Sequence, residues 1–392
     1  MDVNIILLVT NIFVFAICAV VFPVMPWITR DSYLFGVKIP QEEQHSPEAT
    51  QLKRRYKIRC LVGMMIPLAL CVVQFIAIRD WTILATMYLP ILIVPVFLAA
   101  FIPCWKAATR LKAERGWQVS GVLYADTRSA RVRGSLSALP WVWYMVGFAI
   151  IFVTVLIANF RYYDLPDMIP IRFDANMQPA VWTEKSFLTV LMMPLINLGL
   201  LIFMIPVAIL IEKVKLQIDP AKPKLSFAQH RGYRRRMGHA IGFLTLVIII
   251  FIALTGLLVL FPDSAVLASP VLFWGGIVAI HIPVVVLIAV FVKSGQGGCK
   301  IKVDVDDDES DDADESAHSI TTHPGYGDDK HWRLGMFYYN PDDPAYFVEY
   351  RFGGSYSLNY AHLPAKIGAA LLAVGLVALY VWVTIMAVGY WL

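Results

Sequence analysis

The stretch HAIGFLTLVIIIFIALTGLLVLF, residues 239–261, decides the fold class of this chain. It contains no Asp, Glu, Lys or Arg, and about 20 largely apolar residues suffice for an α-helix to cross the hydrocarbon core of a bilayer. Arg234, Arg235 and Arg236 stand shortly before it, as basic residues do at the cytoplasmic end of a span. The stretch therefore predicts a transmembrane helix.

Seven further stretches have the same apolar character, and the overall composition agrees with them. Of the 392 residues, 58% are hydrophobic and 16% charged, whereas soluble domains have roughly 45–50% and about 25%. We therefore predict an all-α integral membrane protein with about eight transmembrane helices. No basic region precedes the first span, which we expect to stay attached rather than be cleaved as a signal peptide. The predicted spans are residues 4–26, 60–78, 82–104, 140–160, 187–211, 239–261, 268–292 and 367–391.

Basic residues set the expected orientation. Lys and Arg are concentrated after the first, third and fifth spans, at residues 30–59, 106–133 and 213–236. Such loops stay in the cytoplasm, which predicts a multi-pass protein of the cell membrane with both termini extracytoplasmic. Positive-inside charge accounts for these loops, so we expect lipid headgroups of the bilayer, and not nucleic acid, as their partner.

The segment between the last two spans divides into an acidic linker and a small module. Residues 304–315 are mostly Asp and Glu, a composition that does not fold alone. An EF-hand spacing can be matched to this run, but Glu309 stands where the loop needs Gly, so we expect no calcium site. The glycine-rich residues 294–300 lack the spacing of a phosphate loop and are interpreted as linker.

Aromatic runs on both sides of the turn Asn340-Pro341-Asp342-Asp343-Pro344 predict a small cytoplasmic β-hairpin module before the last helix. Residues 355–360 are a candidate third strand. A module this short cannot hold a core of its own, so we expect it to pack on the membrane surface or on other loops. The predicted organisation is helices 1–3 with basic loops in 1–138, helices 4–5 with an outer loop in 139–211, helices 6–7 in 212–292, linker in 293–327, module in 328–362 and helix 8 in 363–392.

The stretch DDKHWRLGMFYYNPDDPAYFVEYRFGGSYSLNYAH, residues 328–362, resembles a small domain of unknown function at the cytoplasmic end of polytopic membrane proteins in Gram-positive bacteria. The residues that carry this resemblance are Trp332, Gly335, Phe337, Tyr338, Asn340, Asp343, Pro344, Arg351, Phe352 and Gly353.

The stretch LPDMIPIRFDANMQPAVWTEK, residues 165–185, resembles a second domain of unknown function, shared with immunity and signal-transduction membrane proteins of the SdpI type. Residues 34–43, LFGVKIPQEE, resemble the segment after the first span of these proteins. Arg172 replaces the usual His, so a His-based proton or metal role does not carry over. Met177 replaces the usual Gly, so the turn there has to accept a side chain. The resemblance implies protection against a secreted antimicrobial peptide, coupled to sequestration of a cytoplasmic repressor.

The leading hypothesis is a non-enzymatic sensor or immunity protein, in which the outer loop meets a secreted peptide or envelope signal and the module relays it to a regulatory protein. Charged side chains, stiffening prolines and an interfacial Trp in the loop suit this role. The alternative for the prolines and Trp is that they only set how spans four and five meet the membrane. The candidate ligand-binding residues are Pro166, Asp167, Pro170, Arg172, Asp174, Trp182 and Lys185.

A transporter of unknown substrate is the second hypothesis, since polar residues inside spans often line a pathway. The candidates are Asn11, Gln74, Asn197 and His281. Catalysis is not expected, because HExxH, GxSxG and paired intramembrane aspartates are missing from the sequence. The five cysteines form no CxxC pair, so we expect neither a metal nor a cofactor.

Overall fold

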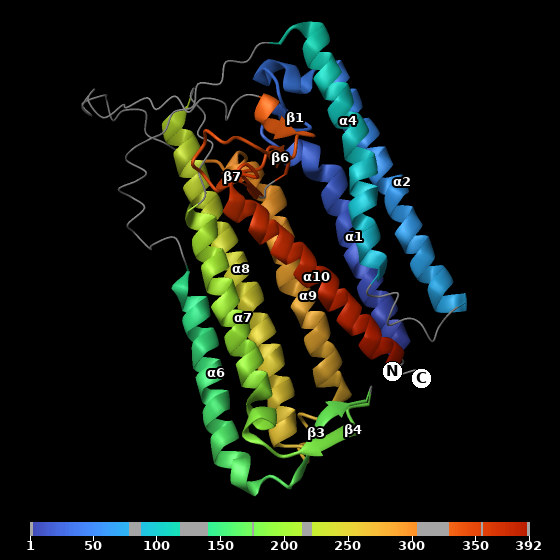
Figure 1. The fold of residues 1–392 in the computed structure, drawn as a ribbon, viewed down its shortest axis with the longest axis vertical. Helices are drawn as coiled ribbons and strands as arrows, with labels where there is room; N and C mark the ends of the chain where they lie inside the picture. Colours follow the sequence, from blue (N-terminus) through green and yellow to red (C-terminus); the bar gives the residue numbers. More distant parts are fainter. Residues whose placement is uncertain are drawn as a thin grey trace, which may run out of the picture. The chain divides into compact units, whose positions relative to one another are not determined.

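The computed structural model describes residues 3–77, 88–117, 140–174, 176–213, 222–303, 329–353 and 356–389. Within these residues, eight helices are long and apolar enough to cross a membrane, which confirms the predicted fold class (Figure 1). They are α1 Val3–Ile28, α2 Pro47–Ala77, α4 Ile93–Arg115, α6 Trp141–Arg161, α7 Phe187–Lys213, α8 Pro223–Leu260, α9 Pro270–Ser294 and α10 Leu363–Gly389.

Two helices begin well before the predicted spans. α2 starts at Pro47 rather than near residue 60, and α8 at Pro223 rather than near residue 239. Lys, Arg, Gln, Leu and Ala, which all favour helices, occupy both extensions. Apolar composition marks only the part of a helix that lies in lipid, so it placed these two starts too late. The third span begins with the 3-10 helix η3, Leu89–Leu92, and residues 82–87 lie outside the described residues.

The chain divides into two compact units. Unit 1 contains residues 131–213 and 231–293, and unit 2 contains residues 2–130, 214–230 and 294–392. In unit 1, α6 packs on α7 and on the apolar part of α8 through a core that includes Tyr144, Leu201 and Ile249. A Cβ atom on Gly147 of α6 would lie 2.8 Å from the Ile249 side chain, so this glycine permits the close helix contact that membrane helices use.

Unit 2 contains α1, α2, α4, α10 and the C-terminal module of residues 329–362 (Figure 1). Its core lies where the module meets the helices: Phe352 of the module is 4.8 Å from Phe101 of α4, centroid to centroid, and 5.6 Å from Phe35. Met336 of the module joins the same cluster. Of the two surfaces expected for the module, the membrane or other loops, packing on a loop is confirmed, because the buried Phe352 ring completes a core shared with Leu34 and Phe35 of the loop after α1 and with α2 and α4.

The strands of the module do not pair as predicted. The structure forms two short hairpins instead of one hairpin across residues 340–344. They join β5 Trp332–Arg333 to β6 Phe337–Tyr338, and β7 Phe347–Glu349 to β8 Tyr356–Leu358. Leu334 and Gly335 take positive φ values of 54° and 69°. The chain therefore reverses direction at these two residues, before it reaches the proline-rich turn. Propensity identified strand-forming residues but not their partners.

The first part of the predicted linker is buried in unit 2. Residues 296–298 form the 3-10 helix η6, Gln296–Gly298, and Gly297 and Gly298 have φ values of 57° and 86°. Glycine is suited to such positive values. The glycines that predict a flexible linker in the sequence are therefore explained by the backbone conformation of a buried turn. The acidic run 304–315, with the EF-hand-like spacing, lies outside the described residues.

Candidate functional site

In unit 1, a β-hairpin joins the end of α6 to the start of α7 (Figure 1). The short 3-10 helix η5, Tyr162–Asp164, leads into β3, Met168–Phe173, which pairs in antiparallel fashion with β4, Pro179–Glu184. The backbone N–H of Lys185 donates to the carbonyl oxygen of Asp167 over 2.7 Å, so Asp167 and Lys185 form a hydrogen-bonded pair. Along an antiparallel pair of strands, hydrogen-bonded and non-hydrogen-bonded pairs alternate. Residues 168, 170, 182 and 184 are therefore the ones whose backbone groups point away from the partner strand.

The tip of the hairpin is built by Asp174. One carboxylate oxygen, Oδ1, accepts hydrogen bonds from the backbone N–H groups of Asn176 and Gln178, both over 2.8 Å. Met177 follows with a φ of 61° and is 3% exposed. A left-handed φ is costly for any residue with a Cβ atom, so this is the backbone position where glycine fits best. The turn does accept a side chain, at the price of local strain.

Lys185 closes the base of the hairpin. Its ammonium group donates to the carbonyl oxygen of Leu165 over 2.6 Å and lies 5.4 Å from the ring centroid of Tyr162. That ring stacks on Phe187 at 3.9 Å. Leu165 and the β3 residue Ile169 are buried in the core that α6, α7 and α8 share. Lys185 thus anchors the hairpin to the helices, and the hairpin is held at both its base and its tip.

The predicted ligand-binding residues therefore occupy different environments. Lys185 is half-buried and Pro170 is buried, whereas the Trp182 side chain is 49% exposed. The exposed members of the set are Pro166, Asp167, Arg172, Asp174 and Trp182. Alternation along β4 places Ala180, Trp182 and Glu184 on its exposed face. The structure thus brings an aromatic side chain and an acidic side chain together on one strand of the hairpin.

In unit 2, the module is tied down by Arg351, whose side chain is fully buried. Its Nη1 donates to the Asp329 carboxylate over 2.5 Å and to the carbonyl oxygen of Gly36 over 3.3 Å. The guanidinium carbon lies 4.8 Å from the centroid of the Trp332 ring. Lys112 of α4 reaches the second oxygen of Asp329 over 2.6 Å. Burial of a charge is tolerated only when it is paired and hydrogen-bonded, as Arg351 is.

The turn at residues 340–344 is held by a buried hydrogen-bond network. The Tyr338 hydroxyl donates to the Asp343 carboxylate over 2.9 Å, and the Asn340 amide donates to that hydroxyl over 3.1 Å. The Asn359 amide donates to the carbonyl oxygens of Asn340 and Asp343. Burial raises the pKa of the Tyr338 hydroxyl, so it stays a proton donor. These motif residues have an architectural role.

Most of the remaining motif residues are also part of the packing. The backbone N–H of Gly353 donates to the Thr29 hydroxyl over 3.3 Å, and Gly335 faces Phe35 and Trp105 so closely that no Cβ atom would fit. Pro344 and Phe337 are exceptions, because both are exposed. The module motif thus describes mainly how the module holds itself on unit 2.

Sequence reasoning missed a second buried cluster in unit 2. Arg30, just after α1, donates through Nη2 to both carboxylate oxygens of Glu349, over 3.0 and 3.2 Å. The same nitrogen lies 2.5 Å from Nε2 of His230. The backbone N–H of Arg30 donates over 3.1 Å to the side-chain oxygen of Gln296. In the sequence Arg30 indicates only a positive-inside loop, and Gly297, which lies against Arg30, Glu349 and His230, is the local sign of close packing.

Two of the polar residues proposed for a transport pathway bond to helix backbone. The Asn197 amide on α7 donates to the carbonyl oxygen of Ile249 on α8 over 3.1 Å. Nδ1 of His281 lies 2.8 Å from the carbonyl oxygen of Ile277 in its own helix. Asn11 is buried on α1. The Asn197 bond is of a kind common between membrane helices.

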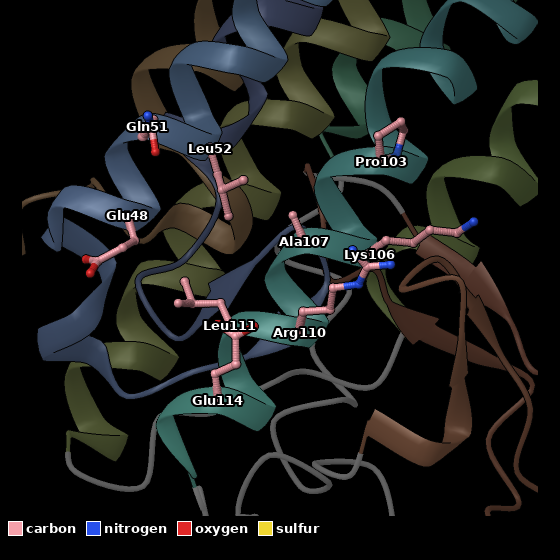
Figure 2. Close-up of a pocket in the computed structure, with 9 residues that line it drawn as sticks. All are labelled: Glu48, Gln51, Leu52, Pro103, Lys106, Ala107, Arg110, Leu111 and Glu114. Atoms are coloured by element: carbon pink, nitrogen blue, oxygen red, sulfur yellow. The ribbon is translucent and has the colours of Figure 1, made fainter.

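A cleft of 420 Å³ lies between α2 and α4 in unit 2 (Figure 2). Leu52 is buried in it, and Ala107 and Leu111 are partly buried. Figure 2 shows the Lys106 and Arg110 side chains together on one side of the cleft, away from Glu48. The lining residues are Glu48, Gln51, Leu52, Pro103, Lys106, Ala107, Arg110, Leu111 and Glu114.

One protein family matches part of the chain. Its description is a domain of unknown function, DUF1648, and it covers residues 149–198. This range holds most of α6, the whole β3–β4 hairpin and the first part of α7. No curated protein and no solved structure matches the chain. The hairpin therefore lies in the middle of the region that this family matches.

Proposed function

We propose that this chain is a non-enzymatic sensor or immunity protein of the cell membrane, in which the β3–β4 hairpin binds an extended segment of an extracytoplasmic peptide. The observation that carries the proposal is the outer edge of β4. The backbone groups of Trp182 and Glu184 point away from β3. In the described residues β3 is the only strand paired with β4. A peptide in extended conformation can pair with such an edge as an added strand.

The two edges of the hairpin are not equivalent. Pro170 lies at a position whose backbone nitrogen points outward from β3, and proline has no N–H to offer. β4 has no proline after Pro179, so its edge can donate at each outward position. We therefore assign the incoming strand to β4.

The side chains beside this edge give the site its chemistry. Trp182 offers a large apolar surface with an N–H at its rim, and Glu184 offers a carboxylate next to it. Clamping at the base by Lys185 and at the tip by Asp174 keeps β4 in one conformation, which reduces the entropy lost on binding. A peptide with an apolar and a basic residue two positions apart would match this pair.

For the relay, we propose the exposed aromatic surface of the module as the site that meets a regulatory protein. Phe337 is 44% and Tyr346 49% exposed, and exposed aromatic side chains are frequent anchors of protein interfaces. Arg351 and Arg30 hold the module on unit 2, so it presents this surface as a fixed platform rather than as a tethered domain. A transporter has less support, because Asn197 and His281 bond to helix backbone.

The test distinguishes binding through the backbone edge of β4 from binding through the Glu184 side chain. Random eight-residue peptides displayed on phage are selected on the purified protein in nanodiscs, and the dissociation constants of the recovered peptides are measured. Glu184→Pro removes an outward N–H, whereas the matched control Glu184→Ala removes only the carboxylate. One lost hydrogen bond is worth about 1 kcal/mol, so we expect binding to Glu184→Pro to be about fivefold weaker than to Glu184→Ala.

Equal binding to both variants contradicts strand addition at β4. If no peptide that binds at the hairpin can be selected, the proposed function itself is contradicted. The thermal transition of both variants is measured first, because a shifted transition shows that the hairpin has been damaged.

A further inference from the structure

We propose that the cleft between α2 and α4 binds the headgroup of an anionic glycerophospholipid, with the phosphate between Lys106 and Arg110. This site lies in unit 2 and does not depend on the proposed function of the hairpin. It narrows the contact with lipid headgroups that positive-inside charge predicts for the basic loops to two residues and one class of headgroup.

A contact between the two helices lies at each end of the cleft. At one end, Arg115 forms an ion pair with Glu48. At the other end, Nη1 of Arg59 lies 3.5 Å from the sulfur of Cys104. α2 and α4 therefore run antiparallel past one another, and the cleft occupies the turns between these two contacts.

The depth of the cleft matches the headgroup layer. The apolar run of α4 ends near Cys104, and helical rise places Lys106 about 3 Å and Arg110 about 9 Å beyond it. The headgroup region on each side of a bilayer is roughly 5–8 Å thick. Trp105 lies at the same level, as aromatic residues of the interface do. Lys106 therefore lies within the headgroup layer and Arg110 at its outer edge, and helical side chains lean toward the N-terminus of their helix, which for α4 is the membrane side.

The charges in the cleft favour a phosphate at this level. Lys106 and Arg110 are four residues apart, hence on one face of α4, and both are exposed. Within the described parts of the chain neither has an ion-pair partner, whereas Glu48 is engaged by Arg115. Arg is well suited to hold a phosphate through two parallel hydrogen bonds. Basic pockets between transmembrane helices bind anionic headgroups in this way.

The rest of the lining suits a glycerol headgroup. Glu114 lies one turn beyond Arg110, at the end of the cleft away from the apolar run, where its carboxylate can accept hydrogen bonds from hydroxyl groups. Leu52 and Ala107 add apolar side chains to the lining. Toward the membrane, the α2 side chains Ile58 and Val62 are 60% and 62% exposed, which provides apolar surface for acyl chains. Phosphatidylglycerol combines these features.

The test uses native mass spectrometry of the purified protein with phosphatidylglycerol, phosphatidylethanolamine and phosphatidylcholine of identical acyl chains. We expect phosphatidylglycerol to bind best. The double variant Lys106→Gln/Arg110→Gln should lose about fivefold in affinity for each charge, hence about 25-fold. The matched control Arg54→Gln/Lys57→Gln removes two exposed charges of α2 that do not line the cleft, and it should bind nearly as the wild type does.

A third variant, Ala107→Trp, fills the cleft without a change of charge and should also weaken phosphatidylglycerol binding. An equal loss in the control variant shows that overall charge attracts the lipid and overturns the site. Preference for phosphatidylethanolamine overturns the anionic headgroup. Displacement by millimolar inorganic phosphate shows a simple anion site and overturns the lipid assignment.

Discussion

Substitution of Gly36 by Ala tests how the C-terminal module is docked in unit 2. Gly36 follows Phe35 in a two-residue turn between β1, Tyr33–Leu34, and β2, Val37–Lys38. A Cβ atom on Gly36 would lie 2.2 Å from the carbonyl oxygen of Gly335 in the module. The two turns touch through backbone alone, so no side-chain rotation relieves this overlap.

The cost has two parts. Ala at the φ of 80° found for Gly36 costs about 1–2 kcal/mol. The turns must also separate by roughly 1 Å, which forfeits a large share of the local packing energy. The hydrogen bond from Arg351 to the Gly36 carbonyl, already 3.3 Å long, breaks at that distance, and a hydrogen bond of a charged group contributes about 1.5–3 kcal/mol. We expect a total loss of about 3–5 kcal/mol in the free energy of unfolding.

Gly116→Ala is the matched control, because Gly116 has a φ of 62° and no atom within 4 Å of its Cβ position. It should lose only the conformational part, about 1–2 kcal/mol. Thermal unfolding in detergent, followed by tryptophan fluorescence, should therefore show a transition roughly 5–10 °C lower for Gly36→Ala than for Gly116→Ala. Equal transitions for the two variants would refute a backbone contact between the loop and the module.

Three further predictions concern buried residues. Arg351→Met should lose about 3 kcal/mol, because it removes the hydrogen bonds that a fully buried guanidinium makes to Asp329 and Gly36, whereas the exposed Arg333→Met should be nearly neutral in the same thermal assay. Met177→Gly should be more stable than Met177→Ala by about 1–2 kcal/mol in thermal unfolding, since both lose the buried side chain but only Ala keeps the strained φ. Tyr338→Phe should lose about 1 kcal/mol at pH 7. Because burial raises the pKa of the Tyr338 hydroxyl, the unfolded chain loses this proton first, and wild-type stability should fall as the pH rises above about 10. Denaturant titrations between pH 9 and 11 should show a shallower fall for Tyr338→Phe.

Much of the candidate site could be located from the sequence, but the structural role of each of its residues could not be predicted from it. The prolines and the exposed Trp182 follow from local pattern, and the residues 165–185 form the hairpin of the matched domain. The charges of Asp174 and Lys185 predict contact with a ligand. In the structure their charges build the turn and anchor the base, which depends on backbone groups that come close only after folding.

The sequence by itself determined the eight helices that can span a membrane and the need of the module for a surface to pack on. These follow from local chemistry: lipid requires long apolar helices, and a short segment cannot bury enough surface alone. Only the tertiary structure decided which strands pair and where the buried charges meet. Arg30 and Glu349 lie 319 residues apart, and Gly36 meets Gly335 across a similar separation. No local pattern encodes such contacts, because the two partners are far apart in the sequence and meet only in the folded chain.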